Sequence, residues 1–271
     1  MIIDQPDSIA IVNNDGNVFR IGDDRGLMKL HSAAKPFQML SFLRRDYNNP
    51  FGLTECERVL LASSHFGQDI HIAALESIMI KTGIDEEQLI LPYSEPYGAL
   101  ARYNLRKLGA PKRKLFHQCS GKHLGFILRS KEIGADESSY HLSNNPVQLE
   151  ALDTIKRFVQ RMDIKMTNDN CGVPTYYVNM TEVAAAYMRF VSTESLTAEM
   201  LRLCAVYVEG EGALATDLMR EYPVIAKSSA NGVIAIGYLP TNTGIAIKST
   251  NWDKLRRLSK LVLDNLETQV A

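Results

Sequence analysis

The sequence has no long apolar run and no excess of charge of either sign. No stretch approaches the roughly 18 consecutive apolar residues that a membrane-spanning helix needs, so we expect no membrane association. The 271 residues carry a formal net charge of −1, whereas a nucleic-acid-binding face is normally basic. The nearest basic run, RKLGAPKRK at 106–114, is typical of a solvated loop between helices. We therefore expect no nucleic-acid partner.

Cysteine is scarce, and its placement excludes a disulfide framework. The four cysteines, Cys56, Cys119, Cys171 and Cys204, are far apart along the chain and lack the close spacings of disulfide-rich secreted domains. Residues 1–12 lack both the basic segment and the long apolar segment of a secretory signal. These features predict a protein of the reducing cytoplasm.

The sequence does contain a hairpin pattern near each end and helical patterns between them. Residues 8–21 predict a strand, an Asn-Asp-Gly turn and a second strand, and residues 232–249 repeat this arrangement. Apolar residues at helical spacing predict helices over these ranges: 70–83 capped by Asp69, 147–163 opened by Pro146, 180–191, 198–208 and 253–270.

This order of elements predicts one α+β domain over residues 1–271. An isolated hairpin is marginal in water, so we expect the two hairpins to join in one antiparallel sheet built from both chain ends. The sheet lobe comprises residues 1–30 and 225–271, and the helical lobe comprises 31–224. Serine β-lactamases and penicillin-binding enzymes share this layout, with a Ser-x-x-Lys motif opening a helix beside the sheet. That likeness is architectural and implies no substrate.

Ser32 and Lys35, within LHSAAKPFQML at 30–40, have the i, i+3 spacing that places two side chains on one face of a helical turn. A serine beside a lysine can be a nucleophile with its base. The pattern also fits a helix-capping serine and a solvated lysine. Average residue usage gives about one chance occurrence in a chain of this length, so the motif alone leaves both interpretations open.

Polar side chains interrupt an apolar run at 61–71, LASSHFGQDIH. Ser64 and His65 stand there before a helix start, which fits either a capped loop or a loop that delivers both side chains into a cleft. Lys227 enters a short polar segment before the second hairpin. A lysine on an edge strand or loop is normally a solvated charge.

Residues 116–127, FHQCSGKHLGFI, hold a dense cluster of Cys, Ser, Lys and His. Cys119 and Lys122 repeat the nucleophile-x-x-Lys spacing, and Gly121 and Gly125 permit close backbone approach. The alternative is a buried, inert thiol.

Residues 167–177, TNDNCGVPTYY, place Asp169 two positions before Cys171. The stretch fits a polar loop between two helices. It also fits a second thiolate held in a tight turn by Gly172 and Pro174.

Together these stretches resemble one family. HSAAKPFQML, SSHFGQ, HQCSGKHLG, NNPVQ, DNCGVPT and LMREYPVIAKSSANGV occur in the order and approximate spacing of the asparaginase II family, the Rhizobium-type L-asparaginases, over roughly residues 8–250. The resemblance implies a β-lactamase-like fold, a homodimer, and hydrolysis of L-asparagine to L-aspartate and ammonia.

The resemblance implies two serine–lysine pairs, Ser32 with Lys35 and Ser64 with Lys227. A lysine acts as a base only when neutral, and moving its pKa from about 10.4 to near 7 costs roughly 5 kcal/mol. Burial and a neighbouring cation are the available means. We expect an acyl-enzyme with Ser32 as nucleophile and Lys35 as its base, with Ser64 able to exchange roles with Ser32.

The resemblance also implies a zinc site formed by Cys119, Lys122 and Cys171, with water completing the shell. Spacing alone would not suggest it, because zinc ligands usually pair two to four residues apart. Two thiolates and a neutral amine nevertheless leave the fourth position open, as in open zinc sites.

Substrate contacts are assigned to His31, His65, His123 and Asp169. His31 stands where the family usually has arginine, and residues 91–100 keep little of the family's CGxHxP stretch. Two alternatives therefore remain beside asparagine hydrolysis. One is a catalytically degenerate member that binds a small ligand, and the other is an amidase for another small amide.

Overall fold

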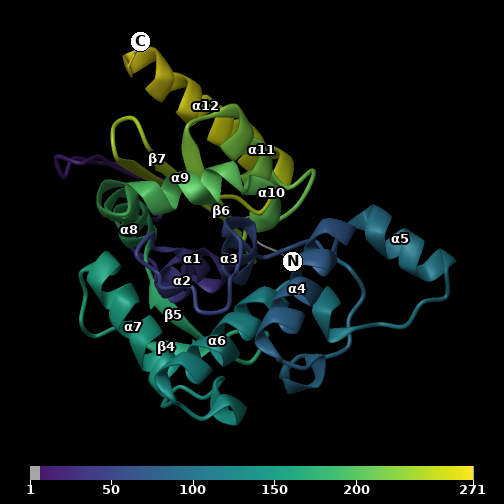
Figure 1. Cartoon of the computed structure of the whole chain (residues 1–271). Helices are drawn as coiled ribbons and strands as arrows, with labels where there is room; N and C mark the ends of the chain where they lie inside the picture. Colours follow the sequence, from purple (N-terminus) through teal and green to yellow (C-terminus); the bar gives the residue numbers. More distant parts are fainter. Residues whose placement is uncertain (1–6, 271) are drawn as a thin grey trace.

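The larger of two sheets has five strands in the order β2-β1-β8-β7-β6, and every neighbouring pair is antiparallel. The computed structural model describes residues 7–270, so residues 1–6 and 271 of the predicted domain lie outside the described part (Figure 1). The strands are β1 (Ser8–Val12), β2 (Val18–Ile21), β6 (Val224–Ser229), β7 (Val233–Tyr238) and β8 (Thr243–Lys248).

Both predicted hairpins form, and they pair with each other. Val12 lies opposite Val18 in the first hairpin, and Tyr238 lies opposite Thr243 in the second. Strand β1 then runs antiparallel to β8, so the two ends of the chain meet inside one sheet. The predicted α+β class, with an antiparallel sheet from both chain ends and a helical part between, is confirmed.

Helices α8 (Met180–Thr193), α11 (Leu214–Glu221) and α12 (Trp252–Val270) pack on this sheet. Every residue of β7 is buried, so both faces are covered. A Cβ at Gly244 of β8 would lie 1.8 Å from the carbonyl oxygen of Ala184, so the close approach of α8 requires glycine there. Helix α8 falls within 31–224, the predicted helical lobe, yet it belongs with the sheet.

Ten helices besides α8 and α12 lie in the described residues, and most form the layer below the sheet in Figure 1. Helix α5 extends away from the body, and none of its residues is buried. Their bounds are α1 (Lys35–Gln38), α2 (Leu40–Leu43), α3 (Glu55–Leu61), α4 (Asp69–Thr82), α5 (Ala99–Lys107), α6 (Ser120–Ile133), α7 (Pro146–Val159), α9 (Ser195–Leu203), α10 (Ala205–Val208) and the α11 already given.

Helices α3 and α6 pack unusually closely. A Cβ at Gly121 would lie 2.2 Å from the carbonyl oxygen of Leu60, and one at Gly125 would lie 2.5 Å from the sulfur of Met39. The predicted role of both glycines in close backbone approach is confirmed. The approach brings the loop after α3 against the start of α6.

A smaller sheet of three strands has the order β3-β5-β4. Its strands are β3 (Met28–Lys29), β4 (Met166–Asn168) and β5 (Pro174–Val178). Residues 167–177 are therefore not a polar loop between helices, which corrects the first interpretation. They end one strand, make a tight turn around Cys171 and form the next strand, most of which is buried.

Several helix boundaries differ from prediction; the helix predicted over 147–163, for example, ends at Val159. The N-cap of α4 is Gln68, and Asp69 is the first helical residue, where its carboxylate still faces the positive end of the helix dipole. The helix predicted over 198–208 is interrupted at Cys204, whose φ of −96° and ψ of 30° separate α9 from α10.

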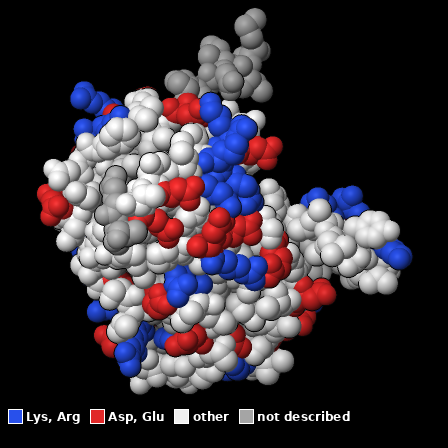
Figure 2. Space-filling view, turned by 90° about the horizontal axis from the view of Figure 1, so that it is seen from above, with Lys and Arg blue, Asp and Glu red and all other residues white. Residues whose placement is uncertain are grey.

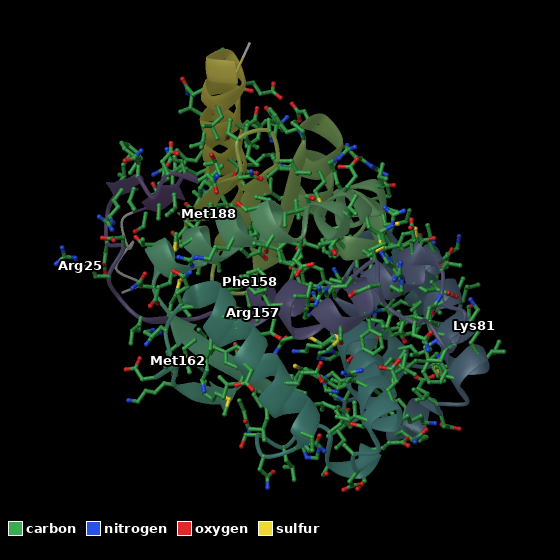
Figure 3. All side chains as sticks on the ribbon, turned by 60° about the vertical axis from the view of Figure 1, so that its left-hand side comes forward. Arg25, Lys81, Arg157, Phe158, Met162 and Met188 are labelled. Carbon is green, nitrogen blue, oxygen red and sulfur yellow. The ribbon has the colours of Figure 1, made fainter. Side chains whose placement is uncertain are left out.

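An aromatic cluster fixes α1 against its neighbours. The ring centroid of Phe37 of α1 lies 5.1 Å from that of Phe158 of α7 in a tilted contact, and 5.3 and 5.5 Å from those of Tyr187 and Phe190 of α8 in edge-on contacts. Figure 3 shows Phe158 and Met188 on these two adjacent helices. Because Lys35 lies two residues before Phe37 in the same short helix, this packing also holds the backbone of the lysine in place.

Neither the helices of the described residues nor the charge distribution in the view of Figure 2 indicates a membrane-spanning segment or a face of uniform charge. None of the helices in residues 7–270 combines the length and hydropathy needed to cross a membrane. Figure 2 shows acidic and basic side chains interspersed over one face.

Candidate active site

Ser32 lies where the two sheets come closest. The Oγ of Ser229 on β6 donates to the carbonyl of Leu30 at 3.0 Å, and the N–H of His31 donates to Oγ1 of Thr175 on β5 at 2.9 Å. His31 takes a φ of 44°, which is uncommon for a non-glycine residue and typical of strained functional sites. Bonds from both sheets thus turn the chain sharply just before Ser32.

Lys35 follows Ser32 by one turn. The 3₁₀ turn His31–Ala34 runs directly into α1, so the two side chains share one face as the spacing predicts. Lys35 is fully buried, with its Nζ 2.8 Å from Ser64 Oγ and 2.5 Å from the carbonyl oxygen of Ser63. The direct partner of Lys35 is thus the second serine, whereas the resemblance pairs it with Ser32.

The surroundings of Lys35 favour its neutral form. Burial lowers the pKa of Lys35 to about 8; the Cys119 and Cys171 thiols oppose this shift, and the charges of Lys122 and Lys227 reinforce it. At pH 7 a lysine with this pKa is about a tenth neutral, against roughly 0.04% for an ordinary lysine. Lys35 can therefore accept a proton near neutral pH.

Lys227 on β6 is buried in an ion pair and is not the solvated edge lysine that its position suggested. Its Nζ lies 2.5 Å from Oε1 of Glu209, and both side chains are almost fully buried. The same carboxylate accepts the N–H of Ser228 at 2.7 Å and its Oγ–H at 2.9 Å. The direct partner of Lys227 is Glu209, whereas the resemblance pairs it with Ser64.

Cys119 and Cys171 lie near each other although they are far apart in the sequence. Cys119 precedes α6, and Cys171 lies in the turn between β4 and β5. The neighbouring Cys171 thiol, with help from Lys35 and Lys122, lowers the pKa of Cys119 well below the usual thiol value, and Cys119 raises the pKa of Cys171. Burial alone would lower the pKa of the Lys122 amine, but both thiols raise it. The three predicted zinc ligands thus lie near one another.

Asp169 connects His31, the residue before Ser32, to the cysteine and lysine cluster. Its Oδ1 lies 2.8 Å from Nδ1 of His31, and its Oδ2 lies 3.9 Å from Nζ of Lys122. Burial alone would raise the pKa of Asp169, but the His31 hydrogen bond and the Lys122 charge lower it. Asp169 is therefore an ionised acceptor close to Ser32.

His65 and His123 do not reach the cavities beside Ser32 within the described residues. His65 Nε2 bonds Ser120 Oγ at 2.7 Å while its Nδ1 accepts the N–H of Gly67, and His123 Nδ1 bonds the Tyr140 hydroxyl at 2.6 Å. Burial lowers the pKa of both imidazoles well below the usual value. In the structure both rings bond neighbouring segments of the protein, and their expected substrate contacts stay predictions.

Two cavities meet at Ser32. The cysteine-side cavity, about 480 Å³, is lined among others by His31, Arg102, His117, Cys119, Asp169 and Cys171. The tryptophan-side cavity, about 300 Å³, is lined among others by Ser64, Phe66, Glu209, Leu214, Ser228 and Trp252. Both share Ser32, Tyr97, Gln118 and Ala230. A larger hollow of about 1260 Å³ lies near α2 and α7 and contains none of the predicted site residues.

Sequence reasoning missed Glu209, Ser228 and Trp252. Glu209 had a readable signal, because it is the only charge within the apolar run CAVYVEG and directly precedes Gly210. A carboxylate in such a run needs a buried partner. Nothing in the sequence around Trp252 indicated a site residue, because Trp252 lines the cavity only through the position at which α12 begins beside the sheet.

Comparison with known proteins gives a family and a fold. A family model described as L-asparaginase II matches residues 7–267. No curated protein matches this chain.

Among solved structures, Mglu in its tris and glutamate form has 14% sequence identity and a TM-score of 0.50, and the match covers 94% of this chain and 58% of that one. A probable glutaminase, YbaS, has 14% identity and a TM-score of 0.45, covering 92% and 80%. The Bacillus subtilis glutaminase YbgJ in covalent complex with 5-oxo-L-norleucine has 12% sequence identity and a TM-score of 0.40. That match covers 94% of this chain and 83% of that one.

At these identities the likeness shows the fold alone, and it confirms the predicted β-lactamase-like class. The chain spans less than three fifths of the length of that Mglu chain.

Proposed function

Because the chain belongs to the L-asparaginase II family, which indicates an amidohydrolase acting on carbon–nitrogen bonds, we propose that it hydrolyses L-asparagine through a Ser–Lys acyl-enzyme. One observation carries the mechanism: a buried lysine of lowered pKa, Lys35, lies 2.8 Å from Ser64 Oγ and one turn from Ser32. Such a lysine is the base that an uncharged serine hydroxyl needs.

Ser32 is the proposed nucleophile. It is half-buried and lines both cavities, whereas Ser64 is buried between Lys35 and the tryptophan-side cavity. Ser32 Oγ attacks the amide carbon, and its proton passes through Ser64 Oγ to the neutral Nζ of Lys35. The same proton returns to the amide nitrogen as the C–N bond breaks and ammonia leaves. Water then attacks the ester, and Lys35 accepts its proton. That proton returns through Ser64 to the Ser32 oxygen as the ester C–O bond breaks, and aspartate is released.

Lys227 is proposed to act as a fixed cation. Its ion pair with Glu209 holds it at the edge of β6, and its charge lowers the pKa of Lys35. In this proposal Lys35 is the base of the site, and Lys227 supplies a positive charge. Asp169 and His31, in the cysteine-side cavity, are proposed to bind the charged α-carbon end of asparagine.

A zinc ion bound by Cys119, Cys171 and Lys122 is also proposed. No group of three His, Cys, Asp or Glu side chains able to hold a metal occurs in residues 7–270, so the site depends on lysine as a third ligand. The donor set fits zinc: two neighbouring thiols and a nearby buried amine, with a fourth position open for water. Bound zinc would polarise a nearby substrate oxygen.

Metal analysis of protein prepared without chelator tests this site. We expect about one zinc per chain, lost in Cys119→Ser, with Cys56→Ser as the matched control. Absence of zinc together with freely titratable Cys119 and Cys171 thiols would remove the zinc proposal and leave the serine–lysine chemistry intact. The homodimer and the cytoplasmic location stay predictions, and light scattering in solution measures the former.

The serine assignment is tested by ammonia release from L-asparagine. Ser32→Ala is expected to abolish turnover and Ser64→Ala to reduce it strongly. Ser63→Ala is the matched control, because the Ser63 hydroxyl is buried without a hydrogen-bond partner in the described residues. Peptide mapping of acid-quenched turnover should find the aspartyl group on Ser32. Undiminished activity of a folded Ser32→Ala protein would contradict the assignment, and saturable asparagine binding without product would favour the ligand-binding alternative.

A further inference from the structure

The two cavities that meet at Ser32 differ in chemistry. The cysteine-side cavity presents His31, Asp169 and Arg102, an ionic lining suited to a charged amino-acid end. The tryptophan-side cavity presents aromatic and aliphatic groups, above all Phe66, Leu214 and Trp252. A substrate whose carbonyl lies at Ser32 therefore has an ionic lining on one side and a lining that includes large aromatic and aliphatic side chains on the other.

The charges around the tryptophan-side cavity are already engaged, apart from the exposed Asp253 at its rim. Glu209 is bonded to Lys227 and Ser228, and Arg256 Nη1 lies 2.6 Å from Oδ2 of Asp217. What remains for a ligand is the aromatic and aliphatic lining together with uncharged polar side chains such as Gln118.

Three elements supply the aromatic and aliphatic lining independently. The rings of Phe66 and Tyr97 pack with centroids 5.1 Å apart, and the Phe66 N–H is fixed by the carbonyl of Glu209 at 2.7 Å. Leu214 begins α11, and Trp252 begins α12. Trp252 and Tyr97 stay 50% and 55% exposed, although large aromatic side chains gain free energy when covered.

Hydrolysis of a primary amide leaves this cavity without a use, because its leaving group is ammonia. A cavity of about 300 Å³ is at the lower end of the size that small-molecule sites have. It adjoins both the nucleophile and Ser64, the residue that would return the proton to the departing nitrogen.

We infer that the tryptophan-side cavity binds an apolar or aromatic group carried by the amide nitrogen, so that N-substituted side-chain amides of aspartate are substrates. This inference rests on the proposed function and extends its substrate class. Ser32 Oγ bonds to the carbonyl carbon, the C–N bond breaks, and the proton carried by Ser64 and Lys35 goes to the nitrogen. A primary amine leaves through the tryptophan-side cavity, and water releases aspartate.

The test compares L-asparagine with the side-chain N-benzyl amide of L-aspartate. We expect kcat/KM for the benzyl amide to equal or exceed that for L-asparagine. Trp252→Ala should lower kcat/KM for the benzyl amide about tenfold more than for L-asparagine, and Trp252→Phe should recover most of that difference. Phe19→Ala, which removes a 55% exposed aromatic ring remote from the site, should leave the ratio unchanged.

Trp252 is the only tryptophan in the sequence, so its fluorescence reports occupancy directly. Saturable quenching by benzylamine is expected, with no comparable change from ammonium. Turnover of L-asparagine without turnover of the benzyl amide would overturn the inference and leave the proposed function standing, as would an equal loss for both substrates in Trp252→Ala. If neither amide is turned over, the proposed function fails, and absence of benzylamine quenching would then overturn the cavity assignment as well.

Discussion

Lys35 and Lys227 are equally buried but have different partners. Lys35, on the helical side, has hydroxyl and carbonyl partners from Ser64 and Ser63. Lys227, on the sheet side, has a carboxylate partner 2.5 Å away in Glu209. The different partners of the two lysines indicate that burial alone does not make a lysine a base. Burial without a counter-ion favours the neutral amine, whereas burial with one retains the charge.

The largest effect is expected from removing the base. Lys35→Met should lower kcat for L-asparagine by about 10² to 10⁴, the range expected when a general base is lost. Lys107→Met, on the exposed helix α5, is the matched control and should retain full activity. Steady-state ammonia release measures both. A folded Lys35→Met protein within tenfold of wild type would place the base elsewhere.

Lys227 should matter more for stability. Lys227→Met leaves Glu209 buried without a counter-charge and is expected to cost about 3 to 5 kcal/mol of unfolding free energy. The double variant Lys227→Met with Glu209→Gln should recover much of this loss, because no uncompensated charge remains. Urea unfolding of the two single variants and the double variant gives the coupling. Strictly additive losses would show that the ion pair is not a unit.

Replacing Lys35 is expected to raise the unfolding free energy, whereas replacing Lys227 lowers it. Its folded pKa of about 8 lies below the unfolded value of 10.5, so the unfolded chain binds more protons between these pH values. The unfolding free energy should therefore rise as pH increases from 8 to 10.5. At pH 7 the buried amine costs up to about 3 kcal/mol, and Lys35→Met should stabilise the fold by up to that amount. A loss of stability in urea unfolding would contradict the burial argument.

The smallest expected effect is on the pH profile. Because neutral Lys35 is the base, kcat/KM should rise with pH through a midpoint near 8 and then level off. Lys227→Met removes a cation that lowers the pKa of Lys35, so the midpoint should move upward, by less than one pH unit. A surface change such as Lys107→Met should leave it in place. A downward shift would mean that another group sets the profile.

The sequence predicted local features well because near neighbours cause them. Turn residues and alternating apolar positions fixed both hairpins, and helical spacing fixed the final helix over 253–270. Ser32 and Lys35 were placed on one face by their three-residue separation. Gly121 and Gly125 were correctly interpreted as points of close approach, Gly121 to the backbone of Leu60 and Gly125 to the side chain of Met39.

Tertiary structure alone decided which of these side chains meet. The partners of the two lysines are Ser64 and Glu209, and neither assignment follows from spacing. Cys119 and Cys171 come near each other only because the β4–β5 turn lies against the start of α6. Local sequence sets backbone conformation through short-range sterics and hydrogen bonds, whereas a buried charge takes whichever partner the packing of distant elements brings within about 3 Å.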